Sequence, residues 1–238
     1  MYGWRARIGH ICPSTPLDNI IYEFDQMLPE GVLVSYTSLN IQYLRPEDFD
    51  RAIAMLEGAA RIMAEGEVDC IVAGGVPVVT LKGSDREILD CIRKVTPVPA
   101  ISSLGASICA LEKLGLGRVV LASPYNEERN GLLAQYLAKQ GIEVLATKGL
   151  GLTRALDMGK LPFDASYRLA REALAQAPEA EGIYIPCARF PVVGNIDVLE
   201  ADLERPVVTS VQSMVWWALD TLSIRTPVAG FGQLMETL

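Results

Sequence analysis

The sequence contains a single histidine, His10, and no pair of cysteines at the CxxC spacing typical of zinc sites. A Ser-His-Asp triad would have to use that one histidine, and we expect no metal centre. Five cysteines are an odd number for a disulfide framework in a chain of 238 residues. No run approaches the roughly 18 apolar residues that cross a bilayer, and the first residues lack the apolar stretch of a signal peptide. We therefore expect a soluble cytoplasmic protein with free thiols.

Positive charge is also scarce, because 21 Lys and Arg face 29 Asp and Glu, giving a net charge of −8. A surface for nucleic acid needs clustered basic residues, so we expect neither nucleic-acid nor membrane partners. A small anion remains possible, because one helix N-terminus can hold it. The length suits one large α/β domain or two of roughly 120 residues, in a monomer or a small homo-oligomer.

The chain does contain an internal repeat. The segment RARIGHICPS (5–14) resembles LGRVVLASPY (116–125), and VDCIVAGG (68–75) resembles AEGIYIPC (180–187). Further on, VPAISSLGASICAL (98–111) resembles RPVVTSVQSMVWWAL (205–219). The matched segments keep both their order and an offset near 110 residues, which favours a duplication.

Each half is predicted to carry four short apolar strands alternating with helices. The strands are expected at 8–11, 32–37, 70–73 and 98–102, and at 119–122, 143–147, 183–185 and 207–210. Between them, a long helix is predicted to begin at Pro46 and to close at Gly66. This pattern indicates two similar α/β lobes with parallel four-stranded sheets, related by a pseudo-twofold axis. The first comprises 1–113 with a tail of about 221–238, and the second comprises 114–220.

Cys187 stands out among the cysteines by its position. It follows a buried strand in YIPCARFP (184–191), and Pro186 ends the ladder of that strand. Ligands of parallel sheets bind beyond the carboxyl ends of the strands, so two facing lobes place Cys187 in a cleft opposite its repeat counterpart, Gly75. The remaining cysteines are predicted to pack in the interior. They are Cys12, whose counterpart is Ser123, and Cys70, Cys91 and Cys109.

Other polar residues also fall at strand ends. Tyr125 follows a strand, and its phenol can donate to a carboxylate. The glycines of AGGVP (73–77) lack the GxGxxG pattern, so we expect no dinucleotide there, and they suit close approach of a ligand to the backbone. His10 lies in an apolar strand and is expected in the core. Helix caps that can also face an anion are predicted at Ser102, Ser103, Thr209 and Ser210.

These features make the chain resemble the aspartate/glutamate racemase superfamily, in the branch of arylmalonate decarboxylase and maleate cis-trans isomerase. The segments CPSTP, SPYNEERN, EGIYIPC and LERPVVTS carry the resemblance. It implies a racemase-like two-lobed fold with the active site between the lobes. Racemases and maleate isomerases place a cysteine on each side of the substrate, whereas this chain has Gly75 on one side. Arylmalonate decarboxylase resembles it in having one glycine and one cysteine there.

The resemblance further implies that Tyr125, the N–H groups of Cys187 and Ala188, and groups just after Gly75 hold the substrate carboxylate. Our candidates for carboxylate and oxyanion binding are Ser14, Gly75, Val76, Ser102, Tyr125, Asn130 and Ala188. Where the decarboxylase has two hydroxyl residues, this chain has Val76 and Pro77, and Pro77 has no N–H.

One lost oxyanion donor costs about 3–4 kcal/mol of transition-state stabilisation. Either Ser14, Thr15, Ser102 or Ser103 compensates, or the substrate and the reaction differ. Arg189 stands where the decarboxylase has a glycine, and in the cleft it would bind a second carboxylate.

The leading prediction is a cofactor-independent decarboxylase of a malonate-type acid, in which Cys187 protonates an enediolate. Loss of CO₂ creates the carbanion without a base, so one acid suffices. The alternative is an isomerase or racemase of a small carboxylic acid, with Cys12 as the second acid/base or nucleophile. A third possibility is a carboxylate-binding protein that has lost its chemistry.

Overall fold

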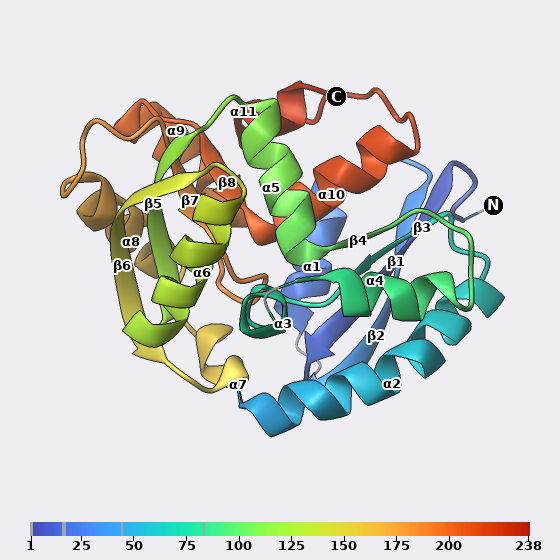
Figure 1. Cartoon of the computed structure of the whole chain (residues 1–238). Coiled ribbons are helices and arrows are strands. Elements are labelled where there is room, and N and C mark those ends of the chain that lie inside the picture. Colours follow the sequence, from blue (N-terminus) through green and yellow to red (C-terminus); the bar gives the residue numbers. More distant parts are fainter. Residues whose placement is uncertain (1, 16–17, 44, 83) are drawn as a thin grey trace.

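The computed structural model describes residues 2–15, 18–43, 45–82 and 84–238. It contains two four-stranded sheets with strand orders β2-β1-β3-β4 and β6-β5-β7-β8, all pairs being parallel (Figure 1). The strands are β1 Ala6–Ser14, β2 Val32–Ile41, β3 Cys70–Ala73, β4 Ala100–Ser102, β5 Arg118–Tyr125, β6 Glu143–Leu152, β7 Gly182–Ile185 and β8 Val207–Thr209. The equal strand order in both sheets confirms the two-lobed α/β fold predicted from the repeat.

All eight predicted strands are present, although five of them are longer than the apolar runs that predicted them, four by several residues. Strands β3 and β7 are buried along their whole length, as expected where helices cover both faces. Strands β1, β2, β5 and β6 continue for several residues beyond their apolar cores. Backbone pairing between β1 and β2, and between β5 and β6, extends these strands toward the edge where the lobes meet.

Helices cover the sheets. They are α1 Asp18–Met27, α2 Pro46–Glu65, α3 Val76–Lys82, α4 Arg86–Arg93, α5 Ser103–Lys113, α6 Glu127–Lys139, α7 Ala155–Met158, α8 Asp164–Leu174, α9 Ile196–Leu203, α10 Ser210–Thr221 and α11 Gly232–Glu236, with a 3₁₀ turn at Val193–Asn195. Helix α2 begins at the predicted Pro46 and is capped by Gly66. Its buried side chains Phe49, Leu56 and Met63 recur every seven residues and so face the sheet. Burial of each such side chain contributes roughly 1.5–3 kcal/mol.

The lobes meet through packed helices and through hydrogen bonds that involve loops. Helices α5 and α10 pack side by side between the two sheets, and α3 packs against α6 (Figure 1). The N–H of Ala155 in α7 donates to the carbonyl of Gln42, just after β2. These contacts hold the carboxyl ends of β1 and β3 opposite those of β5 and β7.

The C-terminal segment lies mainly on the second lobe. Helix α11 packs against α9, α10 and β8, and the side-chain amide of Gln212 donates to the Phe231 carbonyl at 2.7 Å. One contact to the first lobe is the hydrogen bond from Arg5 to Thr226 at 2.8 Å. We had grouped residues 221–238 with the first lobe, and the boundary at 113/114 stays a prediction.

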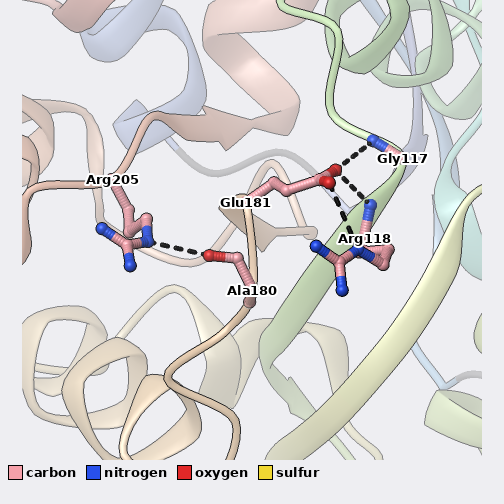
Figure 2. Close-up of polar contacts among 5 residues, drawn as sticks. All are labelled: Gly117, Arg118, Ala180, Glu181 and Arg205. Atoms are coloured by element: carbon pink, nitrogen blue, oxygen red, sulfur yellow. Dashed lines mark hydrogen bonds and ion pairs between the residues drawn. The ribbon is translucent and has the colours of Figure 1, made fainter.

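A carboxylate ties together the starts of the two central strands of the second lobe (Figure 2). Glu181 accepts hydrogen bonds from the backbone N–H groups of Gly117 and Arg118, both at 2.9 Å, and from the Arg118 side chain at 3.2 Å. Nearby, Arg205 donates to the Ala180 carbonyl at 2.8 Å. These bonds fix the register of β5 and β7, whose far ends carry Tyr125 and Cys187. Over the described ranges, no helix has the length and apolar character that a bilayer crossing requires.

Candidate active site

A cavity lies between the lobes at the carboxyl ends of the central strands. It holds about 540 Å³ of empty space, part of it open to solvent. Its polar lining groups come from both lobes, and they are His10, Cys12, Ser14, Ser103, Tyr125, Cys187 and Arg189. Ile20, Ile41, Phe49, Ala155 and Met158 give the cavity an apolar wall. Its position matches the general rule that ligands bind beyond the carboxyl ends of parallel strands.

Gly75 and Cys187 occupy equivalent places in the two lobes and both line the cavity. Ala73 pairs with Ser102 on β4, and Ile185 pairs with Thr209 on β8. Gly75 lies two residues after Ala73, and Cys187 lies two residues after Ile185. A Cβ atom on Gly75 would lie 2.9 Å from the Pro13 ring, so the side chain missing there leaves no unused room.

Cys187 sits in a strained backbone conformation that its surroundings hold in place. Its φ of +91° is rare outside glycine. Its N–H donates to the hydroxyl of Ser210 at 3.0 Å, and its carbonyl accepts the N–H of Phe190 at 3.0 Å. The N–H of Cys187, which we predicted to face the substrate, is therefore already used by the protein.

The thiol of Cys187 is kept in its protonated form. Burial raises the pKa of this thiol, although the Tyr125 phenol and the backbone N–H groups of Arg189 and Phe190 oppose the rise. Only 7 % of the residue is exposed, and its sulfur lies 3.8 Å from the sulfur of Met158. A buried thiol with a raised pKa, reached by a phenol, is suited to donate a proton rather than to attack as a thiolate.

A second thiol faces the same cavity from the first lobe. Cys12 ends the buried part of β1; the sequence favours a packing role for it and makes it the second acid/base or nucleophile only in the alternative function. Burial by itself would raise the pKa of Cys12, but His10, the positive charge of Arg189 and the Tyr36 hydroxyl together bring it to about 7. Nδ1 of His10 lies 3.2 Å from the Val72 carbonyl, which favours the Nδ1–H tautomer. His10 is buried as predicted, but it also lines the cavity.

Two of the predicted carboxylate-binding residues lie away from the cavity. Ser102 is fully buried and caps α5, accepting from the Gly105 N–H at 2.8 Å and donating to Asp85 at 2.8 Å. The next residue, Ser103, lines the cavity instead. Capping thus directs the Ser102 hydroxyl to the first turn of α5 and to Asp85 rather than into the cavity.

Asn130 lies behind Tyr125. It accepts a hydrogen bond from Ser123 at 2.5 Å and donates to the Tyr125 carbonyl at 3.5 Å, so it positions the end of β5. Thr15, considered as a compensating donor, gives its hydroxyl to Asn40 at 3.0 Å. The remaining candidates, Ser14, Gly75, Val76, Tyr125 and Ala188, do line the cavity.

Glu23 is a site-supporting residue that our sequence reasoning missed. From α1 of the first lobe, its carboxylate accepts the N–H groups of Val192 and Val193, in the loop that carries Cys187, at 3.1 and 3.4 Å. Burial raises its pKa to about 7. It lies on the same face of α1 as the buried Ile20 and Met27. A carboxylate on an apolar helix face was the signal that could have revealed it.

In the described ranges, no group of three or more His, Cys, Asp or Glu side chains is placed to hold a metal ion. The sequence model of the family described as arylmalonate decarboxylase matches residues 8–235. The chain belongs to this family. It therefore falls in the arylmalonate decarboxylase and maleate isomerase branch of the racemase-like proteins, as the resemblance implied.

Curated relatives of two kinds, an arylmalonate decarboxylase and maleate isomerases, match most of this chain. An arylmalonate decarboxylase of Bordetella bronchiseptica is 25 % identical over 185 residues, or 77 % of each chain. A maleate isomerase of Geobacillus stearothermophilus is 26 % identical over 245 residues, or 97 % of each chain. These relatives are enzymes, a lyase and an isomerase.

Solved structures of both kinds share the fold. A double mutant of arylmalonate decarboxylase in its liganded form has a TM-score of 0.87 at 23 % identity, covering 96 % of this chain and 98 % of its own. A maleate isomerase of Nocardia farcinica, a mutant with a covalently bound succinylcysteine intermediate, has a TM-score of 0.85 at 19 % identity, covering 97 % and 98 %. At this identity the two matches establish the fold alone.

Proposed function

We propose that the protein decarboxylates a malonate-type carboxylic acid without a cofactor, and that Cys187 is the proton donor. The observation that carries this proposal is the pairing of a buried, protonated thiol with Gly75, which offers no acid or base of its own on the other lobe. Decarboxylation needs one acid and no base, because the electron pair of the broken bond supplies the carbanion. The protonated thiol of Cys187 beside the cavity meets that need.

The first step breaks the bond between the α-carbon and the leaving carboxylate. Its electron pair moves onto the α-carbon and into the retained carboxylate, giving an enediolate and neutral CO₂. The wall of Ile41, Phe49 and Met158 suits the leaving group, because apolar surroundings disfavour the carboxylate and accept CO₂. The polar side of the cavity then receives the charge of the enediolate.

In the second step the Cys187 thiol gives its proton to the α-carbon. The new C–H bond uses the electron pair of the enediolate, and the sulfur keeps the pair of the S–H bond as a thiolate. Tyr125 and the N–H of Arg189 stabilise this thiolate, which regains a proton from solvent. The same contacts that oppose the rise in pKa therefore lower the barrier to proton donation.

Replacement of Cys187 tests the proposal. Cys187→Ser is expected to lower turnover of a substituted malonate by about 10²–10⁴-fold, with an unchanged fold by circular dichroism. Cys91→Ser is the matched control, since Cys91 lies in α4 and outside the cavity lining. In D₂O the wild-type product should carry one deuterium at the α-carbon. Wild-type turnover in Cys187→Ser would overturn the assigned role.

A second candidate function, isomerisation or racemisation, is supported by one observation, the Cys12 thiol with its pKa near 7 in the same cavity. Cys12 would then serve as the base or nucleophile and Cys187 as the acid. Deuterium in recovered substrate, or conversion of maleate without release of CO₂, would select this reaction, and Cys12→Ser would abolish it. Binding of acids without any turnover would instead favour the carboxylate-binding protein.

A further inference from the structure

Arg189 is a buried cation whose guanidinium has no hydrogen-bond partner among the residues that the structure describes. It lies two residues after Cys187, only 3 % of it is exposed, and it lines the cavity. Nε, Nη1 and Nη2 of its guanidinium are all buried, and none of them makes a hydrogen bond to a residue in the described ranges. Its backbone is held in place, because its carbonyl accepts the side-chain amide of Asn19 at 3.0 Å.

An uncompensated guanidinium in the interior is unfavourable, because arginine does not lose its proton in proteins and gives up its hydration on burial. Structural arginines avoid this cost by pairing with carboxylates or carbonyls, as Arg205 does with the carbonyls of Ala180 and Pro178. The cavity that Arg189 lines is a source from which an anionic ligand can supply a counter-ion. The charge of Arg189 also lowers the pKa of both Cys12 and Cys187, so it acts where the two thiols face the ligand.

The neutral donors of the cavity are few. Val76 and Pro77 offer no hydroxyl, the N–H of Cys187 is taken by Ser210, and Ser102 is absent from the lining. Tyr125, Ser14 and Ser103, together with the N–H of Ala188, remain. A site depleted of hydroxyl donors beside Gly75 therefore contains one full positive charge with five N–H donors.

The leaving carboxylate is the wrong partner for this charge. A guanidinium on that group would stabilise the ground state more than the transition state, in which its negative charge departs with the bond. A guanidinium on the retained carboxylate does the opposite, because negative charge accumulates there as the enediolate forms.

We propose that Arg189 binds the carboxylate that the substrate retains and is the main charged group that stabilises the enediolate, in place of the hydroxyl donors missing after Gly75. The enediolate role rests on the proposed decarboxylation, whereas the carboxylate site stands independently of the reaction. The proposed ligands are carboxylic acids that place one carboxylate at Arg189 and the α-carbon beside Cys187. A second carboxylate is not needed for binding at Arg189.

Binding measured without turnover tests the site. Calorimetric titration of Cys187→Ser with propionate and phenylacetate should show saturable binding, and the corresponding amides should not bind. Adding Arg189→Met should weaken binding of the acids by about 10- to 100-fold, with Arg189→Lys in between. Arg61→Met, on the exposed face of α2, is the matched control and should bind as Cys187→Ser does.

Unliganded stability separates a ligand-binding arginine from a structural one. Arg189→Met in an otherwise wild-type chain should melt at the same temperature as wild type or several degrees higher, because an unpaired charge has been removed. A lower melting temperature together with unchanged acid binding would overturn the proposal. So would binding that depends on Arg189 only when the ligand carries two carboxylates.

Kinetics then distinguish this proposal from the proposed function. On a substituted malonate, Arg189→Met should lower kcat by about 10²–10³-fold, beyond any rise in KM. If Cys187→Ser keeps full turnover while acid binding still requires Arg189, the proton-donor role fails and the carboxylate site stands. If Cys187→Ser is inactive while Arg189→Met binds acids and turns over as wild type, the carboxylate site fails and the proton donor stands.

Discussion

Replacement of Glu23 by glutamine should change how the stability of the protein depends on pH. Glu23 is 2 % exposed, its Oε2 has no hydrogen-bond partner in the part of the chain that the structure describes, and burial raises its pKa from an ordinary 4.5 to about 7. The difference of about 2.5 pH units corresponds to about 3 kcal/mol, at about 1.4 kcal/mol for each unit. Between these pH values the folded protein binds the proton that the unfolded chain has lost, so stability falls as pH rises. Below pH 4.5 this contribution is fully present, and above pH 7 it is lost.

Glu23→Gln keeps an oxygen to accept the N–H groups of Val192 and Val193 but has no charge to bury. Urea unfolding at a series of pH values from 5 to 8 should show the variant close to wild type at pH 5. At pH 8 the variant should be more stable, by up to about 3 kcal/mol. Parallel stability curves for the two proteins across that range would show that Glu23 titrates normally and would refute the reasoning.

Two further predictions concern groups at the edge of the site and inside it. Ser102→Ala removes the cap of α5 and the bond to Asp85, and it should lower the free energy of unfolding by about 1–2 kcal/mol while leaving kcat unchanged; a large loss of kcat would show that Ser102 reaches the substrate. Iodoacetamide at pH 7 should modify Cys12 before Cys187, because the pKa of Cys12 is about 7 and burial raises that of Cys187. Peptide mass mapping reads the order, and the reverse order would contradict the assigned thiol states.

Local sequence patterns were sufficient to predict the strands, the long helix and their repetition. Apolar runs, a proline at the start of α2 and a glycine at its end are local signals, because backbone conformation depends on neighbours along the chain. The place of Cys187 followed in the same way, since Pro186 ends a strand wherever that strand packs. Caps at Ser102 and Thr209 were correctly predicted from hydroxyls at the expected helix starts.

Which of those strand-end side chains line the cavity depends on how the two lobes pack. Ser102 and Ser103 are adjacent in sequence, yet the turn into α5 sends one hydroxyl to the cap and places the other residue on the cavity. Glu23 and Arg189 gain their roles from contacts between the lobes, and these contacts join residues about 170 positions apart in the chain. No local pattern encodes such contacts, because they depend on how two separately folded sheets face each other. The guanidinium of Arg189 in particular becomes buried only when both lobes pack around it.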